Sequence, residues 1–489
     1  MATLNYKSTR GDKNYISSSH AIKKGIADDG GLYMPETIPT LSLDKIMALT
    51  PMTYAQRAYE VLSLFLDDYD PETLKNICNV TYCSERFGDH AAPVTNLENG
   101  ISVLELWHGP TCAFKDMALQ IMPRLLSNAL EITGEDKTAF ILVATSGDTG
   151  KAALEGYRNV DGVKIMVFYP EKGVSGIQKL QMASQEGNNV SVVAINGNFD
   201  DAQTGVKEIF ASSDVKEKLL DKKTFLSSAN SINWGRLAPQ IVYYVSAYCD
   251  MVKSGRLSAG ETLDVCVPTG NFGDIFAAFI AKKMGLPLGR LICASNKNRI
   301  LADFFETGVY DRRRDFYTTT SPSMDILISS NLERLLFVQS DAETVKTLMT
   351  DLKEKGVYTV SPELLKKLRE DFEGGWCSEE ECADTIKEVF EKENYLIDPH
   401  TAVAMKCAKE KMGENKMLVV STASPYKFAP AVLKALTGKV EKEEFDSIST
   451  LSAATKTKVP VPLASLKEKK IRFNKTVEVK DMTREVLGF

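Results

Sequence analysis

Histidine, tryptophan and excess positive charge are all scarce in this sequence of 489 residues. It has only four histidines and three tryptophans, and its formal net charge is -6. A chain with no basic excess lacks the electrostatic footprint with which proteins bind nucleic acid or anionic membranes. Its longest apolar stretch free of charge runs only from Leu237 to Cys249, short of the ~18 residues that a membrane-spanning helix requires. We therefore expect neither nucleic-acid nor membrane partners.

A secretory signal and a dense cysteine framework are also missing. The charged N-terminus has no apolar run behind it, which favours a cytoplasmic protein. Nine cysteines are scattered along the chain and most stand in apolar segments, so we expect reduced thiols in the core. The pairs Cys78/Cys83 and Cys377/Cys382 have the spacing of a zinc site, but neither has a nearby histidine or second pair to complete a ligand set. No metal is therefore expected.

The composition is that of an ordinary folded protein. Hydrophobic residues make up 44% and charged residues 25%, which excludes disordered, collagenous and coiled-coil chains. At one domain per ~150 residues the length predicts about three units. We expect residues 1–95 to form a mainly helical N-terminal extension and residues 96–435 to form the core. Residues 436–489, rich in lysine and glutamate, are expected to be a surface tail.

Apolar patterning in the core predicts an α/β fold. From Met117 to Ala129 apolar residues recur at helical spacing, and Asp200 or Asp201 is expected to cap a helix that ends near Ala211. Short, continuous apolar runs alternate with such helices, as strands buried on both faces of a parallel sheet require. The predicted strands are 139–144, 163–169, 190–195, 263–267, 291–294 and 417–421.

Two of these predicted strands run into glycine-rich turns that precede helices. The first turn is TSGDTGK at 145–151, and the second is PTGNFGD at 268–274. In such turns glycine lets backbone N–H groups approach an anion, while the helix N-terminus adds partial positive charge. Each turn is therefore a candidate cradle for a phosphate or a carboxylate, although many α/β proteins have glycine-rich turns for steric reasons alone.

Other known functional motifs fail on spacing. A nucleotide P-loop needs glycine where Thr145 stands and Ser or Thr where Ala152 stands. A dinucleotide-binding turn needs three glycines in a fixed pattern, and only Gly270 and Gly273 are present. Ser175 lies between Gly173 and Gly176, which do not have the Gly-x-Ser-x-Gly spacing of a hydrolase nucleophile. Neither ATP, NAD nor serine-hydrolase chemistry is supported.

A third segment contains a candidate reactive lysine. Lys115 follows Ala113 and Phe114 at the start of an amphipathic helix. Partial burial and the positive end of the helix dipole both favour the neutral amine, which is the form that makes a Schiff base. The alternative is a lysine that reaches water beside Asp116.

Together these segments resemble the threonine synthase family, in its long form with an N-terminal extension. A reactive lysine with two anion cradles is what a carbonyl cofactor with a phosphate group requires, and pyridoxal 5'-phosphate is such a cofactor. The similarity extends over nearly the whole chain, and its motifs occur in family order. They are YKSTRG at 6–11, DGGLYMP at 29–35, GPTCAFKD at 109–116, TSGDTGKAA at 145–153, NSINWGR at 230–236, PTGNFGDIFAAF at 268–279 and STASPYKF at 421–428.

The resemblance implies two open α/β domains with largely parallel sheets and the cofactor in the cleft between them. It implies that Lys115 is the catalytic residue and binds the cofactor as a Schiff base. A hydroxyl beside the pyridine nitrogen, from Thr422 with Ser421, would leave the ring largely unprotonated. The other implied cofactor-binding residues are Phe114, Gly270, Asn271, Phe272, Gly273 and Asp274.

The resemblance also implies two groups of substrate-binding residues. The role of Asp148 is left open: it is protonated, turned toward another donor, or used to order its loop. Asn233 and Arg236 have an alternative role as caps of the helix that follows. The substrate carboxylate is assigned to Ser146, Gly147, Asp148 and Thr149, and the substrate phosphate to Ser231, Asn233, Arg236 and Lys427.

The implied reaction converts O-phospho-L-homoserine and water into L-threonine and phosphate. The sequence departs from the family pattern at Gly235, Ser424 and Tyr426, in the expected walls of the site. These departures leave open a related phospho-lyase that eliminates phosphate without completing threonine. The implied partner is a small-molecule substrate, with the chain acting as a monomer or small homo-oligomer.

Overall fold

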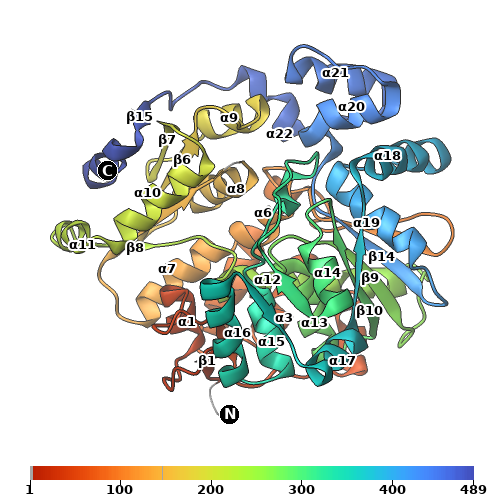
Figure 1. The fold of residues 1–489 in the computed structure, drawn as a ribbon, viewed down its shortest axis with the longest axis horizontal. Coiled ribbons are helices and arrows are strands. Elements are labelled where there is room, and N and C mark those ends of the chain that lie inside the picture. Colours follow the sequence, from red (N-terminus) through yellow and green to blue (C-terminus); the bar gives the residue numbers. More distant parts are fainter. Residues whose placement is uncertain (1–3, 146) are drawn as a thin grey trace.

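The computed structural model describes residues 4–145 and 147–489, and its N-terminal part is a mainly helical unit (Figure 1). Strands β1 and β2 pair antiparallel. Thr53 and Gln56 form a capping box that starts α3, and the buried side chains of Ala58, Val61 and Leu62 form its inner face. The elements are β1 (Tyr6–Ser8), α1 (Ser18–Lys24), β2 (Tyr33–Pro35), α2 (Leu43–Leu49), α3 (Tyr54–Leu62), α4 (Pro71–Thr81) and α5 (Ser84–Phe87).

The larger sheet has six strands in the order β13-β10-β9-β14-β4-β3. All neighbours are parallel except β3 and β4. Every residue of β9 is buried, as expected for a strand covered by helices on both faces. The strands are β3 (Val94–Asn96), β4 (Ile101–Glu105), β9 (Leu263–Pro268), β10 (Leu288–Ser295), β13 (Phe372–Trp376) and β14 (Lys416–Ser421).

The smaller sheet has five parallel strands in the order β15-β7-β6-β5-β8. The predicted apolar runs in both sheets are strands in the structure, within a few residues of the expected bounds. The strands are β5 (Thr138–Ala144), β6 (Val163–Pro170), β7 (Val190–Asn196), β8 (Thr224–Ser227) and β15 (Thr476–Glu478).

The C-terminal segment differs from the predicted surface tail. It passes from α20 and α21 on the larger lobe to the smaller lobe, where β15 adds the edge strand beside β7 (Figure 1). Met482 and Val486 are buried against the smaller sheet. The lysines and glutamates that suggested a tail occupy the solvent side, while sparse apolar residues supply the packing.

Helices cover both sheets, and α12 lies at the centre of the molecule (Figure 1). The apolar run noted in the sequence, Leu237–Cys249, is the interior of this helix, which is buried on nearly every side. The predicted stripe from Met117 to Ala129 is divided between α6 and α7. The helix expected to begin at Asp200 or Asp201 is α10, capped instead by Asn198, with Asp201 completing a capping box.

The remaining elements connect or flank these layers. Strands β11 (Val309–Asp311) and β12 (Val357–Thr359) form a small antiparallel pair. The helices are α6 (Lys115–Leu119), α7 (Met122–Ile132), α8 (Asp148–Tyr157), α9 (Gly176–Ala183), α10 (Phe199–Ala211), α11 (Ser213–Leu220), α12 (Trp234–Lys253), α13 (Gly273–Met284), α14 (Ile300–Thr307), η1 (Pro322–Met324), α15 (Leu332–Gln339), α16 (Ala342–Lys355), α17 (Pro362–Asp371), α18 (Glu379–Glu393), α19 (Pro399–Glu410), η2 (Pro425–Phe428), α20 (Ala429–Thr437), α21 (Glu444–Thr455), α22 (Val461–Ala464), η3 (Leu466–Glu468), η4 (Val479–Asp481) and α23 (Met482–Gly488).

The cysteines lie in the packed interior. All nine, which fall within the described ranges, are free thiols, and every one except Cys83 is buried. Burial raises the pKa of the Cys112 and Cys407 thiols to about 12, so both are protonated. None of the helices within the described ranges combines the length and hydropathy that a bilayer crossing needs.

Candidate active site

Lys115 is the first residue of α6 and is placed by the end of β14. The amide of Phe114 donates to the carbonyl of Thr422 at 2.8 Å, and Ala113 bridges antiparallel to Ala423. Before the lysine, the chain turns tightly at Gly109, where a Cβ would lie 2.5 Å from the Cβ of Asp116. This local geometry holds the backbone just before Lys115 against Thr422 and Ala423.

The Lys115 amine sits in a desolvated environment that contains charges of both signs. Its side chain is 13% exposed, its Nζ donates to Ser323 Oγ at 3.2 Å, and Asp148 Oδ2 lies 4.0 Å away. Burial, helped by the charges of Lys427 and Arg236 and opposed by Asp148, lowers the pKa of Lys115 to about 8. A neutral amine is therefore accessible near neutral pH, as a nucleophilic or proton-accepting lysine requires.

The lowered pKa predicts an acylation profile for Lys115 in the cofactor-free protein. A small reagent such as acetic anhydride reacts with neutral amines, so we expect labelling of Lys115 to rise with pH around a midpoint of about 8, against 10.5 for an ordinary lysine. Mass spectrometry of peptides after brief labelling between pH 6 and pH 11 measures it. Exposed Lys392, whose pKa is raised by its hydrogen bond to Glu388, is the internal reference, and coincident profiles for the two lysines would contradict the assignment.

After β5, Thr145 Oγ1 accepts from the amides of Gly147 and Gly150. A Cβ at Gly147 would lie 2.6 Å from the Gln178 side chain, so glycine permits the approach of Gln178 to Asp148. Thr149 is the second residue of α8. Ser146, predicted to contact the substrate carboxylate, lies outside the described residues.

Asp148 is ionised and paired. It forms a salt bridge with Lys427 at 2.9 Å and accepts from Gln178 Nε2 at 2.7 Å. Burial opposes its ionisation, but the charges of Lys427 and Lys115 hold the pKa of Asp148 well below its usual range. The sequence left open whether Asp148 is protonated, turned toward another donor or used to order its loop, and the lowered pKa does not fit the protonated form. The structure shows the carboxylate turned toward another donor.

Two cations, Lys427 and Arg236, lie near the lysine together with the carboxylates of Asp148 and Asp116. The side chain of Lys427 is fully buried, and its Nζ also donates to the carbonyl of Thr111 at 2.7 Å. Arg236 is buried and donates to the carbonyl of Ala229, while its Nε has no partner among the described residues. Burial lowers the pKa of Arg236 to about 10, which still leaves it charged. A buried guanidinium without a carboxylate partner is suited to a bound anion.

The turn from Gly270 to Gly273 leads from β9 into α13 and has the form of an anion cradle. Phe272 adopts a left-handed conformation, with φ of 65°, as the N-cap of this helix. The backbone amides of the turn have no acceptor among the described residues and lie at the positive end of α13. A Cβ at Gly270 would lie 2.7 Å from the carbonyl oxygen of Ser323. The turn therefore fits a phosphate group.

The structure shows where several other predicted cofactor contacts lie. Ser421 Oγ accepts from Trp107 Nε1 and from Thr401 Oγ1, so it is engaged behind the site. The carboxylate of Asp274 accepts from Tyr243 and Tyr244 in α12, and burial raises its pKa to about 6. Both tyrosines bind Oδ1, and Oδ2 has no hydrogen-bond partner among the described residues. Because a carboxylate repels a phosphate, Asp274 can contribute only its backbone amide to the cradle.

Asn233 has the capping role that the sequence offered as an alternative. Its Oδ1 accepts from the amide of Gly235 at the start of α12, and its Nδ2 donates to the carbonyl of Ile22 in the N-terminal unit. Ser231 lies two residues earlier in the same segment and is only half-buried. Its side chain is not seen to contact the lysine.

Two side chains at the site were missed by sequence reasoning. Ser323, which contacts Lys115, donates its amide to Nε2 of His400 at 3.1 Å, and Nδ1 of His400 lies 2.6 Å from Asp398. His400, oriented by Asp398, therefore holds η1 and its Ser323 next to the lysine. Asp398-Pro399 is a helix-start signal at α19, but nothing in the sequence relates this helix to a loop some eighty residues earlier.

The sequence matches known protein families along most of its length. Residues 93–423 match the family of pyridoxal-phosphate dependent enzymes, residues 5–82 match the threonine synthase N terminus, and residues 401–485 match the threonine synthase C-terminal region. Threonine synthase from Schizosaccharomyces pombe is 38% identical over 88% of this chain and 89% of its own length. Threonine synthase-like 1 from Homo sapiens is 41% identical over 86% of this chain, which spans only 58% of that relative.

The fold of the chain is also similar to that of a solved threonine synthase over nearly the full length of the chain. The crystal structure of pyridoxal-phosphate-bound threonine synthase from Brucella melitensis superimposes with a TM-score of 0.90 at 38% identity, covering 99% of both chains. The parallel sheets and helices described above are those of two α/β domains with a helical N-terminal unit. The chain therefore belongs to the threonine synthase family of pyridoxal-phosphate dependent enzymes.

Proposed function

We propose that this protein is a threonine synthase that converts O-phospho-L-homoserine and water into L-threonine and phosphate. The observation that carries the proposal is the buried guanidinium of Arg236, which has no carboxylate partner among the described residues and lies close enough to Lys115 to lower its pKa. It supplies positive charge for a substrate phosphate beside the reactive amine, whereas the charge of Lys427 is already paired with Asp148.

The residues present fit the cofactor. Lys115 would hold pyridoxal phosphate covalently, the free amides from Gly270 to Gly273 would hold its phosphate, and the hydroxyl of Thr422 would lie beside its ring nitrogen. Phe114 directly precedes the lysine and would line the same pocket. When bound, the cofactor supplies an electron sink for negative charge that develops on the substrate carbons.

The chain's own side chains then position the substrate and move its protons. With a pKa of about 8, the amine of Lys115 is matched to accept and return protons at carbon near neutral pH. Ser323 Oγ holds that amine in place. Arg236 would hold the substrate phosphate, and the turn at 147–149 would approach the carboxylate. Because Asp148 is neutralised by Lys427, its charge does not repel that carboxylate.

The products test the proposal. Holoprotein incubated with O-phospho-L-homoserine is expected to release phosphate and threonine in equal amounts. Phosphate accompanied by a 2-oxo acid and ammonia, with no threonine, would contradict the synthase and support a related phospho-lyase. That second candidate rests on the departures from the family pattern at Gly235, Ser424 and Tyr426. A variant with Lys115→Ala is the control for phosphate released by contaminating phosphatase.

A further inference from the structure

One buried arginine, Arg334 in α15, connects three separate parts of the chain. Its Nη1 donates to Oδ1 of Asn331, and its Nη2 donates to the carbonyl oxygens of Tyr33 at 3.2 Å and Ile232 at 2.5 Å. The side chain is fully buried, and no described carboxylate lies within ion-pair distance. Burial lowers the pKa of Arg334 to about 9. It is a buried cation bound by carbonyl and amide oxygens.

The contact with Asn331 reaches the phosphate cradle. The backbone amide and Nδ2 of Asn331 both donate to the carbonyl of Asn271, at 3.1 and 3.0 Å. Because Arg334 takes Oδ1, the side-chain amide of Asn331 can only present its NH2 group to Asn271. With the carbonyl of Asn271 held outward in this way, the amides of the turn face the opposite side, where a phosphate would bind.

The contact with Ile232 reaches the segment assigned to the substrate phosphate. Ile232 lies between Ser231 and the N-cap Asn233, one turn before Arg236. The same guanidinium therefore fixes the backbone on which Arg236 is mounted and the backbone that forms the cradle. A lysine could not do this, because an ammonium does not present the planar fork of donors that reaches three oxygens at once.

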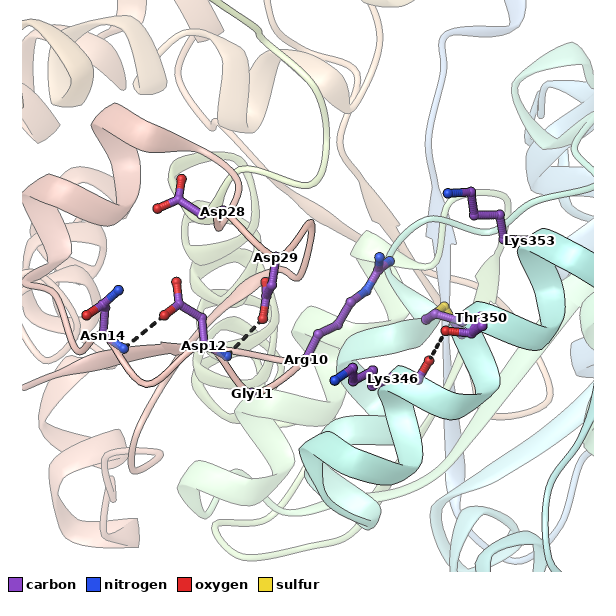
Figure 2. A pocket seen from close by; sticks show the side chains of 10 residues that line it. Arg10, Gly11, Asp12, Asn14, Asp28, Asp29, Lys346, Thr350 and Lys353 are labelled. Atoms are coloured by element: carbon purple, nitrogen blue, oxygen red, sulfur yellow. Dashed lines mark hydrogen bonds between the residues drawn. The ribbon is translucent and has the colours of Figure 1, made fainter.

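The N-terminal unit holds the outer end of this connection. Besides the carbonyl of Tyr33, it supplies Thr9 and Arg10, which both donate to Glu333, the residue before Arg334. Arg10 also lines a cavity of about 520 Å³ between the N-terminal segment and α16 (Figure 2). The start of α15 is therefore fixed from the solvent side by the N-terminal unit and from the inside by the cradle.

We infer that Arg334 is a positioning residue that aligns the cofactor-phosphate cradle with the segment carrying Arg236. Its substitution weakens binding of two different phosphate groups without removing a group that touches either. The half of the inference that concerns the substrate phosphate rests on the proposed function. The half that concerns the cofactor rests on family membership and the geometry of the cradle.

The test compares cofactor binding by apoprotein variants. In Arg334→Lys we expect the dissociation constant for pyridoxal phosphate, measured by visible absorbance, to rise about tenfold or more, as for the loss of a charge-assisted hydrogen bond. Affinity for pyridoxal, which lacks the phosphate, is expected to change less than about twofold. Inorganic phosphate, measured as an inhibitor of pyridoxal phosphate binding, should weaken in parallel.

Arg57→Lys is the matched control. Arg57 is also a buried arginine that joins the N-terminal unit to the core, donating to the carbonyls of Leu49, Thr50 and Ser246. It has no contact with the cradle. We expect it to lower the thermal unfolding temperature about as much as Arg334→Lys and to leave the preference for pyridoxal phosphate over pyridoxal unchanged. An equal loss of that preference in both variants, or no loss in Arg334→Lys, would overturn the inference.

A second variant keeps the test decisive if Arg334→Lys fails to fold. Asn331→Ala removes the side-chain donor to Asn271 at a buried position of the same connection while leaving Arg334 in place, and we expect it to reproduce the selective loss of phosphate affinity. Where both fold, the double variant should show less than the sum of the two effects. Selective loss of cofactor affinity in the variants of a protein that makes no threonine would support the inference about Arg334 and refute the proposed function. Threonine production together with an unchanged preference for pyridoxal phosphate over pyridoxal would refute the inference and support the proposed function.

Discussion

Lys115→Ala is expected to abolish the visible absorbance of the holoprotein and to lower turnover of O-phospho-L-homoserine by at least ~10³-fold. The amine is the group proposed to hold the cofactor and to move the proton at carbon, so one substitution removes both roles. Its contact with Ser323 Oγ is a single hydrogen bond at a partly exposed position, so we expect little change in thermal unfolding. Absorbance spectra, a threonine assay and a melting curve of the same preparation measure the three effects.

The control for this substitution is another lysine with lowered exposure. Lys164, on β6, packs over the rings of Phe140 and Phe489 and has its own pKa lowered by burial. Lys164→Ala should keep both the absorbance and the turnover. Visible absorbance and undiminished threonine production in Lys115→Ala would refute the role proposed for this residue.

Arg236→Met is expected to raise the KM for O-phospho-L-homoserine by about a hundredfold, because a charge-assisted pair with a phosphate contributes roughly 3 kcal/mol. Since Arg236 has no carboxylate partner among the described residues and an unpaired Nε, its removal also relieves the cost of burying a charge. We therefore expect the apoprotein to unfold at the same or a higher temperature. Steady-state kinetics and calorimetry test the two parts.

A purely structural arginine would behave in the opposite way. Arg57 is ion-paired with Asp250 at 2.7 Å and bonded to three carbonyls, so Arg57→Met should lower stability and leave KM unchanged. Arg236→Lys should recover part of the affinity, because an ammonium supplies the charge but not the bidentate fork. Unchanged KM in Arg236→Met would remove the observation on which the proposed substrate rests.

The elements that sequence could predict are those specified by local pattern. Strands β5, β6, β7 and β9 are short, continuous apolar runs, and only strands covered on both faces need such runs. The glycine turns at 147 and 270 were visible because glycine marks places where other atoms approach the backbone. Lys115 stood out through its apolar neighbours and its place at a helix start.

What the sequence could not predict depends on contacts between distant segments. Arg334, Ser323 and His400 occur in unremarkable helices and loops, and their importance lies only in the residues brought against them. Strand β15 is three residues long and mostly polar, so its sequence has no strand pattern that could be recognised. It forms a strand because it pairs with the exposed edge of β7. The sequence fitted Asn233 both as a helix cap and as a phosphate ligand. The hydrogen bond from its Nδ2 to the carbonyl of Ile22, a residue far away in sequence, favours the cap.

The late edge strand has a consequence for how the protein is made. Asn196 in β7 and Glu478 in β15, whose side chains are hydrogen-bonded, are 282 residues apart in sequence. During synthesis the smaller sheet therefore emerges with an open edge, and that edge stays uncovered until β9, β10, β13 and β14 of the larger sheet have followed. Contacts between residues so far apart in sequence also slow folding, because the chain loses the conformational entropy of closing a long loop before these contacts stabilise it. Nascent chains of this protein should depend on chaperones until β15 has docked, and fragments that stop before it should aggregate.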